Sequence, residues 1–289
     1  MRYVIAVGGN ALTDEKVLKS LSDAVFALRK RDAEIIITHG NGPQVGELAL
    51  VEKKNLAVLT AQTEAELGLE IEQSLAEAKN RGGATEPAIV LTRVRVDARD
   101  AEFRHPTKPI GPFIGKALAR GIARKGMVVR KLIHGYRRVV PSPMPREILE
   151  AGLIRRLLRD GYVVIAAGGG GIAVVRKGKR LAYADAVLDK DLTSSLLAAT
   201  LKADRFVILT DVDGAFLDFN TPLSRMIRRA SAKEMAGHIA AGQFEEGSML
   251  PKVEACVEFV KRTGKPAAIG NLGNVRSVLN LEKATLITP

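Results

Sequence analysis

Two carboxylates enclose a lysine in the segment Asp189-Lys190-Asp191-Leu192, which stands directly ahead of a predicted helix over residues 193–202. Lysines can neutralise the charge that develops when a phosphoryl group is transferred, and an aspartate can position them. An aspartate at a helix start can also act only as a cap. Taken alone, this segment favours the capping role, so the catalytic hypothesis needs further charged groups.

Further acidic and basic candidates follow a predicted strand and precede a predicted helix. Residues 206–210 form an apolar strand that ends in Asp211, Asp213 and Gly214. A strand closed by an Asp-Gly turn is common and predicts little by itself. Residues 247–252 form a loop that presents Lys252 at the start of a helix, in whose core Cys256 is expected to pack.

Glycine-rich loops follow two β-branched runs, residues 3–7 and 34–38. Glycine lets backbone N–H groups approach an anion with no Cβ in the way. Two such loops on adjacent strands predict one phosphate cradle. Its candidate residues are Gly8, Gly9, Asn10, Gly40, Asn41 and Gly42.

Four consecutive glycines, residues 168–171, follow a third buried run. Each glycine costs roughly 0.5–1 kcal/mol relative to alanine, which is more than a simple turn requires. The pattern G-x-x-x-x-G-K-[ST] is missing from the chain, so the phosphate-loop nucleotide fold is not supported. A nucleotide would bind here through another architecture.

These residues require a parallel sheet to bring them together. Strand, helix and strand are predicted over residues 3–7, 16–31 and 34–38, with further strands over 88–91, 128–132, 162–166, 206–210 and 267–269. This order predicts an α/β fold, a three-layer αβα sandwich with a mainly parallel central sheet. Ligands of such sheets gather at the carboxyl ends of the strands, where the glycine-rich loops lie.

The stretch over residues 97–145 departs from this rhythm and is expected to form an inserted basic protruding subdomain. A helix is predicted over residues 148–159, and a lobe boundary follows it. The predicted lobes are residues 1–160, including the protruding lid subdomain, and residues 161–289.

The charge of the chain is concentrated in one segment. The net charge is +12 over 289 residues, and residues 104–146 hold eleven Lys or Arg and no Asp or Glu. Such a segment could contact a nucleic-acid backbone or cover a smaller polyanion such as a nucleotide phosphate. We favour the second role.

Several classes are disfavoured by composition. The longest apolar stretch, residues 163–175, is shorter than the roughly 20 residues that cross a bilayer. A single cysteine forms neither an internal disulfide nor a multi-thiolate metal site. The amino terminus lacks the pattern of a secretory signal, so a cytoplasmic protein without membrane contact is expected.

Taken in order, the motifs closely resemble carbamate kinases of the amino acid kinase superfamily over nearly the whole chain. The most specific strings are His-Gly-Asn-Gly-Pro-Gln-Val-Gly at residues 39–46 and Arg-Arg-Val-Val-Pro-Ser-Pro at residues 137–143. The others are residues 8–12, 106–113, 168–171, 189–192, 209–214 and 247–252.

The resemblance implies reversible phosphoryl transfer between ATP and carbamate, giving ADP and carbamoyl phosphate, with Mg²⁺ carried by the nucleotide. It implies that Lys108, Lys190 and Lys252 stabilise the transferred group and that Asp191 orients the lysines. The amino-terminal lobe would bind carbamate through the cradle residues named above, and a homodimer is implied. The nucleotide would lie along Gly168, Gly169, Gly170, Asp211, Asp213, Gly214 and Met249.

The chain departs from the family pattern at three places. The family usually carries Gln-Gly-x-Ile-Gly-Tyr where residues 64–69 read Glu-Ala-Glu-Leu-Gly-Leu, and Leu250 and Ala173 replace a glycine and a proline. The acidic helix over residues 64–77 is interpreted as a solvated face. Three alternatives therefore stay open: a related kinase for another small carboxylate or phosphate, a nucleic-acid-binding protein, and a catalytically silent regulator that keeps the nucleotide site.

Overall fold

Buried β-branched runs form an eight-stranded sheet at the centre of the molecule. The structure is a computed structural model that describes residues 1–9, 12, 14–80, 86–132 and 134–289. The strand order is β15-β17-β16-β12-β1-β2-β9-β3, and in the described residues only the β16–β17 pair runs antiparallel. The strands are β1 (Arg2–Val7), β2 (Glu34–His39), β3 (Pro87–Val90), β9 (Val163–Ala166), β12 (Arg205–Thr210), β15 (Arg229–Ser231), β16 (Ala267–Asn271) and β17 (Thr285–Thr288).

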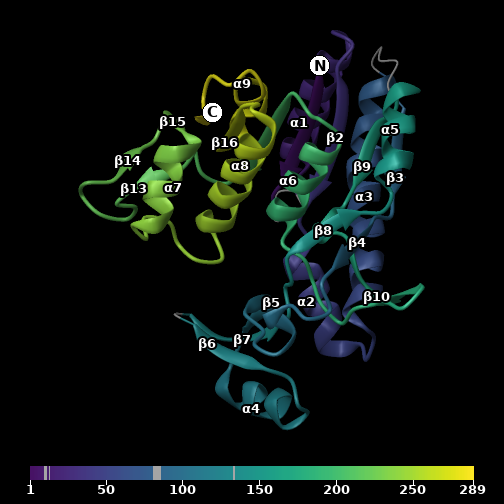
Figure 1. Cartoon of the computed structure of the whole chain (residues 1–289), viewed down its shortest axis with the longest axis vertical. Coiled ribbons are helices and arrows are strands. Elements are labelled where there is room, and N and C mark those ends of the chain that lie inside the picture. The colour runs from purple at the N-terminus through teal and green to yellow at the C-terminus, as the bar shows by residue number, and fades with distance from the viewer. Residues whose placement is uncertain (10–11, 13, 81–85, 133) are drawn as a thin grey trace.

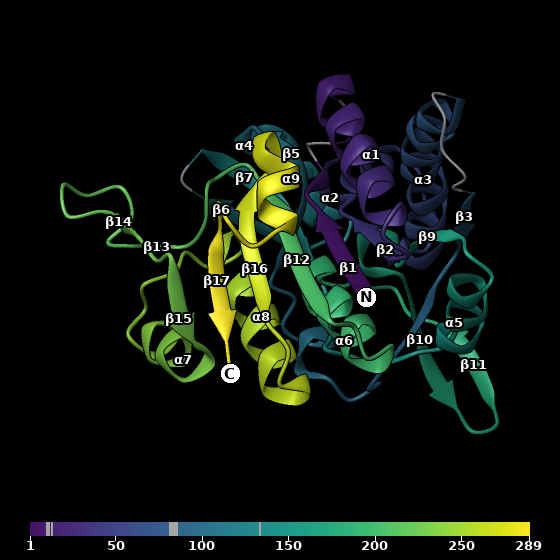
Figure 2. The same ribbon diagram turned by 90° about the horizontal axis from the view of Figure 1, so that it is seen from above.

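Helices cover both faces of this sheet, which confirms the predicted αβα sandwich (Figure 2). Successive side chains of β1 point to opposite faces, so Val4 and Ala6 enter one core and Tyr3, Ile5 and Val7 enter the other. The helices of the first core are α5 (Ala151–Arg159), α6 (Lys190–Thr200), α7 (Ala232–Ala240) and α8 (Met249–Thr263). Those of the second are α1 (Glu15–Arg29), α3 (Leu56–Asn80) and α9 (Val275–Leu279).

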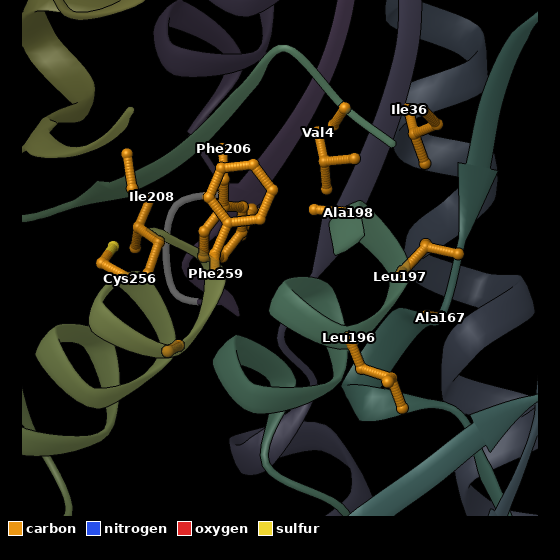
Figure 3. Packing of buried hydrophobic residues seen from close by; sticks show 14 of the residues in the cluster. Val4, Ile36, Ala167, Leu196, Leu197, Ala198, Phe206, Ile208, Cys256 and Phe259 are labelled. Carbon is orange, nitrogen blue, oxygen red and sulfur yellow. The ribbon is translucent and has the colours of Figure 1, made fainter. Parts of the chain in front are cut away.

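The first core joins α6 and α8 to the sheet through large side chains (Figure 3). Phe206 of β12 and Phe259 of α8 are both fully buried, with ring centroids 5.5 Å apart. Cys256 is also fully buried beside them, as the sequence predicts. This packing fixes the two helices whose first turns carry the candidate lysines.

A second sheet, in the order β11-β10-β4-β8, lies beside the first. Its strands are β4 (Arg93–Val96), β8 (Pro145–Ile148), β10 (Ile172–Lys177) and β11 (Arg180–Tyr183). The predicted start of a helix at Ile148 is wrong, because Ile148 pairs with Val94 at the end of β8 and α5 begins only at Ala151.

A third sheet stands apart from the sandwich with one helix against it (Figure 1). We call it the β5–β7 unit; it holds β5 (Lys108–Ile114), α4 (Lys116–Arg124), β6 (Val129–Leu132) and β7 (Gly135–Val140). The predicted strand over residues 128–132 is therefore present as β6, but it belongs to this antiparallel sheet and not to the central one. The remaining elements are α2 (Gly42–Val51), β13 (Phe216–Leu217), β14 (Arg225–Met226), and the 3-10 turns η2 (Ala101–Phe103), η3 (Gly168–Gly170) and η4 (Leu272–Asn274).

The sheet order crosses the predicted lobe boundary. β9 follows residue 160 in sequence, yet it lies between β2 and β3 from the first half of the chain. The division into lobes stays a prediction. The helices in the described part of the chain are too short or too polar to cross a lipid bilayer.

The β5–β7 unit is attached to α2 by a contact between two glycine backbones, which generates a prediction. A Cβ added to Gly46 would lie 1.8 Å from the backbone nitrogen of Gly111, which itself has φ +70°. We expect Gly46→Ala to lower the free energy of unfolding by about 2 kcal/mol or more, because the backbones must separate. Urea unfolding measures this change.

Gly121→Ala in α4 is the matched control, because a Cβ there meets nothing within 4 Å. We expect it to be neutral or to stabilise by about 0.5–1 kcal/mol, as alanine does in a helix. Equal unfolding midpoints for Gly46→Ala and the wild type would contradict the importance of the contact.

Candidate active site

Two adjoining pockets lie at the carboxyl ends of β12, β1, β2 and β9, and they share Ser248 and Lys252. This is the edge at which a parallel α/β sheet binds its ligands. The first pocket, of about 270 Å³, is lined by Gly8, Gly9, Gly40, Asn41, Gly42, Val45, Lys108, Pro109, Ile110, Gly169, Val187, Leu188, Asp189, Lys190, Asp191, Gly247, Ser248, Pro251 and Lys252. The second, of about 590 Å³, is lined by Thr210, Asp211, Val212, Gly214, Phe216, Asp218, Phe219, Asn220, Gly242, Gln243, Phe244, Glu245, Ser248, Met249 and Lys252.

Asp189 begins α6 and thereby presents the next two residues to the first pocket. Its Oδ1 accepts hydrogen bonds from the backbone N–H of Asp191 at 2.9 Å and of Leu192 at 3.1 Å. The capping role predicted for this aspartate is therefore present together with the clustering that catalysis requires. The positive end of the helix dipole at this start also favours a bound anion.

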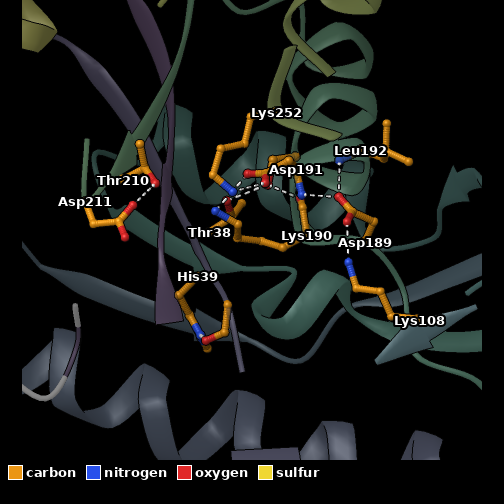
Figure 4. Close-up of polar contacts among 12 residues, drawn as sticks. Thr38, His39, Lys108, Asp189, Lys190, Asp191, Leu192, Thr210, Asp211 and Lys252 are labelled. Atoms are coloured by element: carbon orange, nitrogen blue, oxygen red, sulfur yellow. Dashed lines mark hydrogen bonds and ion pairs between the residues drawn. The ribbon is translucent and has the colours of Figure 1, made fainter. Parts of the chain in front are cut away.

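Three lysines from three elements converge on two aspartates (Figure 4). Lys190 Nζ of α6 lies 2.8 Å from Asp191 Oδ1, and Lys252 Nζ of α8 lies 3.1 Å from Asp191 Oδ2. Lys108 Nζ, at the start of β5, lies 2.5 Å from Asp189 Oδ2. The fold brings these residues together although they are up to 144 positions apart, and their catalytic roles stay a prediction.

Burial and pairing oppose one another in the charge balance of this cluster. Burial would raise the pKa of Asp191, but the ammonium groups of Lys190 and Lys252 outweigh it and hold that pKa at about 2. Burial lowers the pKa of Lys190, while for Lys252 the burial effect is overcome by Asp191 and the net shift is upward. Asp191 is therefore ionised at neutral pH.

Lys190 keeps donors for a ligand. Although its Nζ is buried and paired with Asp191, it makes no hydrogen bond of good geometry in the part of the chain that the structure describes. A buried ammonium with unused N–H groups at the edge of a pocket fits an anionic group such as a phosphoryl oxygen.

The loops after β1 and β2 form the opposite wall of the first pocket. A Cβ on Gly9 would lie 2.9 Å from the carbonyl group of Gly40, so the two loops approach each other as only glycines allow. Asn41 is buried, and its Nδ2 donates a hydrogen bond of 2.8 Å to Thr63 Oγ1. Gly8 and Gly42 also line the pocket, whereas Asn10 lies outside the described residues.

The four-glycine loop packs directly behind these residues. Gly169, Gly170 and Gly171 all have positive φ angles, and a Cβ on Gly169 would lie 2.1 Å from Asn41 Nδ2. Of the three glycines predicted to contact the nucleotide, Gly169 lines the first pocket, while Gly168 and Gly170 line neither pocket. Their assignment to the nucleotide stays a prediction.

The second pocket contains most of the other predicted nucleotide residues. Asp211, Gly214 and Met249 line it, but the exposed Asp213 does not. Its aromatic side chains, Phe216, Phe219 and Phe244, were not selected from the sequence, because no motif marks them. Aromatic side chains among polar groups suit a flat heteroaromatic ring that carries polar substituents.

Two titratable residues next to the site were missed. His39 and Glu64 are almost fully buried, and both pack against Gly168. The interpretation of residues 64–77 as a solvated face is wrong for Glu64, which is 1% exposed. The signal was its helical spacing, because Thr60, Glu64, Leu67 and Ile71 occupy one buried face of α3.

Burial shifts both groups toward their uncharged forms. Burial lowers the pKa of His39 to about 4, against the raising effects of the Gly40 and Glu64 backbones. Burial raises the pKa of Glu64 to about 8, against the lowering effects of the Thr92 and Gly168 N–H groups. Both side chains are therefore mostly neutral at pH 7.

The fold, the paired pockets and the lysine cluster define a kinase of the sandwich type without a phosphate-binding P-loop. The sequence profile of the amino acid kinase family matches residues 1–271, and the chain belongs to that family.

Within this family the chain is similar to carbamate kinases over its full length. The carbamate kinase of Trichomonas vaginalis is 40% identical over 313 aligned positions, covering 100% of both chains. That of Thermoplasma volcanium is 39% identical, again with 100% of both chains covered. A structure of carbamate kinase from Giardia lamblia bound to AMP-PNP is 34% identical with a TM-score of 0.88, covering 99% of this chain and 98% of that one. The chain is thus a member of the carbamate kinase branch.

The position of Asp191 between two ammonium groups generates a prediction for stability. Asp191→Asn leaves Lys190 and Lys252 without their shared carboxylate, so we expect the free energy of unfolding at pH 7 to fall by about 3 kcal/mol or more. Because folding lowers the pKa of Asp191 from 3.8 to about 2, its contribution is present above pH 4 and is lost as the pH falls toward 2. The difference between wild type and variant should therefore shrink in acid.

Urea unfolding at pH 7 and at about pH 3 measures both effects. The exposed Asp160→Asn is the control, with an expected change within about 0.5 kcal/mol. A difference for Asp191→Asn that grows as the pH falls would contradict the ion-pair explanation.

Proposed function

We propose that this chain is a carbamate kinase that transfers a phosphoryl group reversibly between ATP and carbamate. The observation that carries the proposal is the convergence of Lys108, Lys190 and Lys252, held by two aspartates, where the two pockets meet. Three positive charges at a junction between a small pocket with glycine-rich walls and a larger pocket with three phenylalanines suit transfer between a small anion and a nucleotide.

The acceptor binds in the first pocket and the nucleotide in the second. A carboxylate oxygen of carbamate attacks the γ-phosphorus of ATP, the new O–P bond forms, and the bond from that phosphorus to the bridging oxygen of ADP breaks. Charge builds up on the transferred phosphoryl oxygens and on the leaving oxygen. Lys190 and Lys252 neutralise this charge, and Lys108 closes on the same group from β5.

No proton needs to move in this reaction, because the attacking carboxylate oxygen carries none. Asp191 agrees with this requirement, since its pKa of about 2 makes it a poor base at neutral pH. Its role is to hold the two lysines at fixed positions, and Asp189 holds Lys108 in the same manner.

A divalent metal, which we propose to be Mg²⁺, would enter with the nucleotide. The described residues contain no group of three or more His, Cys, Asp or Glu side chains that could hold a metal by themselves. Mg²⁺ commonly uses only one or two carboxylates together with substrate phosphates, and Asp211 in the second pocket fits that arrangement. When bound, the metal would neutralise charge on the phosphates.

The departures from the family pattern do not line the first pocket. Leu69 and Glu66 on α3 are exposed, and Ala173 is buried in β10, where it pairs with Val94. Leu250 packs against the first core in the opening turn of α8. Because these four residues do not line the first pocket, their replacement favours no second substrate over carbamate.

The proposal includes a covering role for the β5–β7 unit, which supplies Lys108, Pro109 and Ile110 to the first pocket. It also includes the two lobes, residues 1–160 and 161–289, and a homodimer. Sedimentation velocity of the intact chain tests the dimer.

Formation of ATP from ADP, Mg²⁺ and carbamoyl phosphate tests the function directly. We expect robust ATP production in short incubations, with a control without protein because carbamoyl phosphate decomposes when warmed. Acetyl phosphate is tested with ADP as an alternative phosphoryl donor, and a panel of small carboxylates is tested with ATP as alternative acceptors. If ADP binds but none of the carbamoyl phosphate reacts, the proposed acceptor is wrong.

Removing the lysines tests the assigned roles. We expect Lys190→Ala and Lys252→Ala each to lower kcat at least about a hundredfold, because each loses several kcal/mol of charge stabilisation in the transition state. The exposed Lys177→Ala at the end of β10 is the matched control and should retain wild-type turnover. Near-wild-type kcat in both site variants would rule out these roles.

A further inference from the structure

Glu64 is a buried carboxyl group that the proposed reaction does not use. It lies in the middle of α3, is 1% exposed and lines neither pocket. Its Oε1 accepts hydrogen bonds from the N–H groups of Gly168 at 3.1 Å and Thr92 at 3.2 Å. In the described part of the chain, Glu64 forms no ion pair with a lysine or arginine.

These hydrogen bonds hold the start of the four-glycine loop from behind. Thr92 Oγ1 accepts a hydrogen bond of 2.8 Å from the N–H of Ala167, so Thr92 and Glu64 fix two successive N–H groups of the loop. Ala167 has a φ of +52°, a backbone conformation that residues other than glycine adopt at a cost of about 1 kcal/mol or more. The loop therefore depends on outside contacts to keep its shape.

The backbone of this loop forms part of the wall of the first pocket, in which the acceptor is proposed to bind. Gly169 follows the anchored Gly168, packs against the amide group of Asn41 and lines the first pocket. A displacement of Gly168 would therefore move both Gly169 and the Asn41 side chain. Glu64 thus acts on the pocket through one intervening residue.

Among the described residues, no positive charge is paired with the Glu64 carboxyl group, and Arg176 and Lys177 of the neighbouring β10 are exposed. His39, at the end of β2, lies on the same side of Gly168 as Glu64, and burial holds its pKa at about 4, so that it is neutral. Glu150, ahead of α5, acts on Glu64 with the same sign of charge, and Lys190 of α6 is paired with Asp191. The strands β3 and β9 and the turn η3 carry no charged residue, and Arg29 of α1 is bonded to the carbonyl groups of Ala33 and Gly161.

We propose that Glu64 is a positioning residue that holds the glycine loop in place as an uncharged acid. This inference rests on the proposed function for its kinetic consequences. Burial raises the pKa of Glu64 to about 8, which agrees with the geometry. Above that pH, an unpaired negative charge behind the loop would shift Gly169 and repel the anionic acceptor.

Kinetics over a range of pH test the proposal with the variants Glu64→Gln and Glu64→Ala. Gln is close to Glu in shape and is neutral at every pH. At pH 7, we expect the kcat/KM of Glu64→Gln for carbamoyl phosphate to stay within about threefold of the wild-type value. Above about pH 8, we expect kcat/KM to decrease in the wild type but not in Glu64→Gln. We expect Glu64→Ala to lose about tenfold or more, because the loop loses its anchor.

Glu66→Gln makes the same change of charge on the exposed face of α3 and should leave the pH profile of the wild type unchanged. A fall above pH 8 that persists in Glu64→Gln, or full activity in Glu64→Ala, would overturn the proposal.

Thermal unfolding gives a second readout that needs no activity. Because folding raises the pKa of Glu64 from 4.5 to about 8, its stabilising effect is complete below pH 4.5 and is lost as the pH rises to about 8. The unfolding temperature of the wild type relative to Glu64→Gln should therefore fall across this range. If the wild type forms no ATP, the proposed function fails. A difference in unfolding temperature that falls with pH would still support Glu64 as a neutral anchor. A difference that stays constant with pH would overturn that role.

Discussion

The arrangement of the active site depends on one buried carboxylate, Asp191, between two buried ammonium groups. Removing charges from water is costly unless each has a close partner. Lys190 and Lys252 come from α6 and α8, so their pairing with Asp191 fixes the first turns of the two helices relative to each other. The helices can meet this requirement because Phe259 and Cys256 of α8 and Leu197 and Ala198 of α6 belong to the same core on one face of the sheet. The polar and apolar contacts thus support one geometry.

The parallel sheet then determines which loops face this charged cluster. β12, β1, β2 and β9 are neighbours and run in one direction, so their carboxyl ends meet at a single edge. The loops after β1, β2 and β9 contain glycines and approach one another closely, which leaves space for a small anion. The loop after β12 leads to the larger pocket. The order of the strands therefore separates the pocket proposed for the acceptor from the pocket proposed for the nucleotide.

Most elements were predictable because parallel strands buried on both faces are continuous β-branched runs. The strands at residues 3–7, 34–38 and 206–210 agree closely with β1, β2 and β12. The position of β9 between β2 and β3 was not predictable, since strand order follows from tertiary packing and not from local pattern. For the same reason, Ile148 continues a strand through its pairing with Val94, although its neighbours favour a helix.

The site was predictable where motifs carry it and unpredictable where burial decides. The lysines and aspartates belong to short segments with recognisable spacing, and the structure brings them together. The three phenylalanines of the second pocket lie in segments without such a pattern, and Asp213 is exposed and lines neither pocket despite its motif. Glu64 was predicted to be exposed because acidic helices usually face solvent. It is buried because it lies at helical spacing from Leu67 and Ile71, on the face of α3 that packs inward.

In the proposed function, the glycine loop lets a residue that lines neither pocket influence the pocket of the acceptor. Its positive φ angles give the backbone of Gly169 the space to line the pocket, but such a backbone has little intrinsic preference for one shape. Glu64 of α3, Thr92 between β3 and β4, and Asn41 ahead of α2 supply that preference from three separate segments. α3, which carries Glu64, and α6, which carries Lys190, cover opposite faces of the central sheet. The proposed acceptor pocket therefore depends on both cores of the sandwich. A substitution in either core is expected to alter catalysis even where it contacts no ligand.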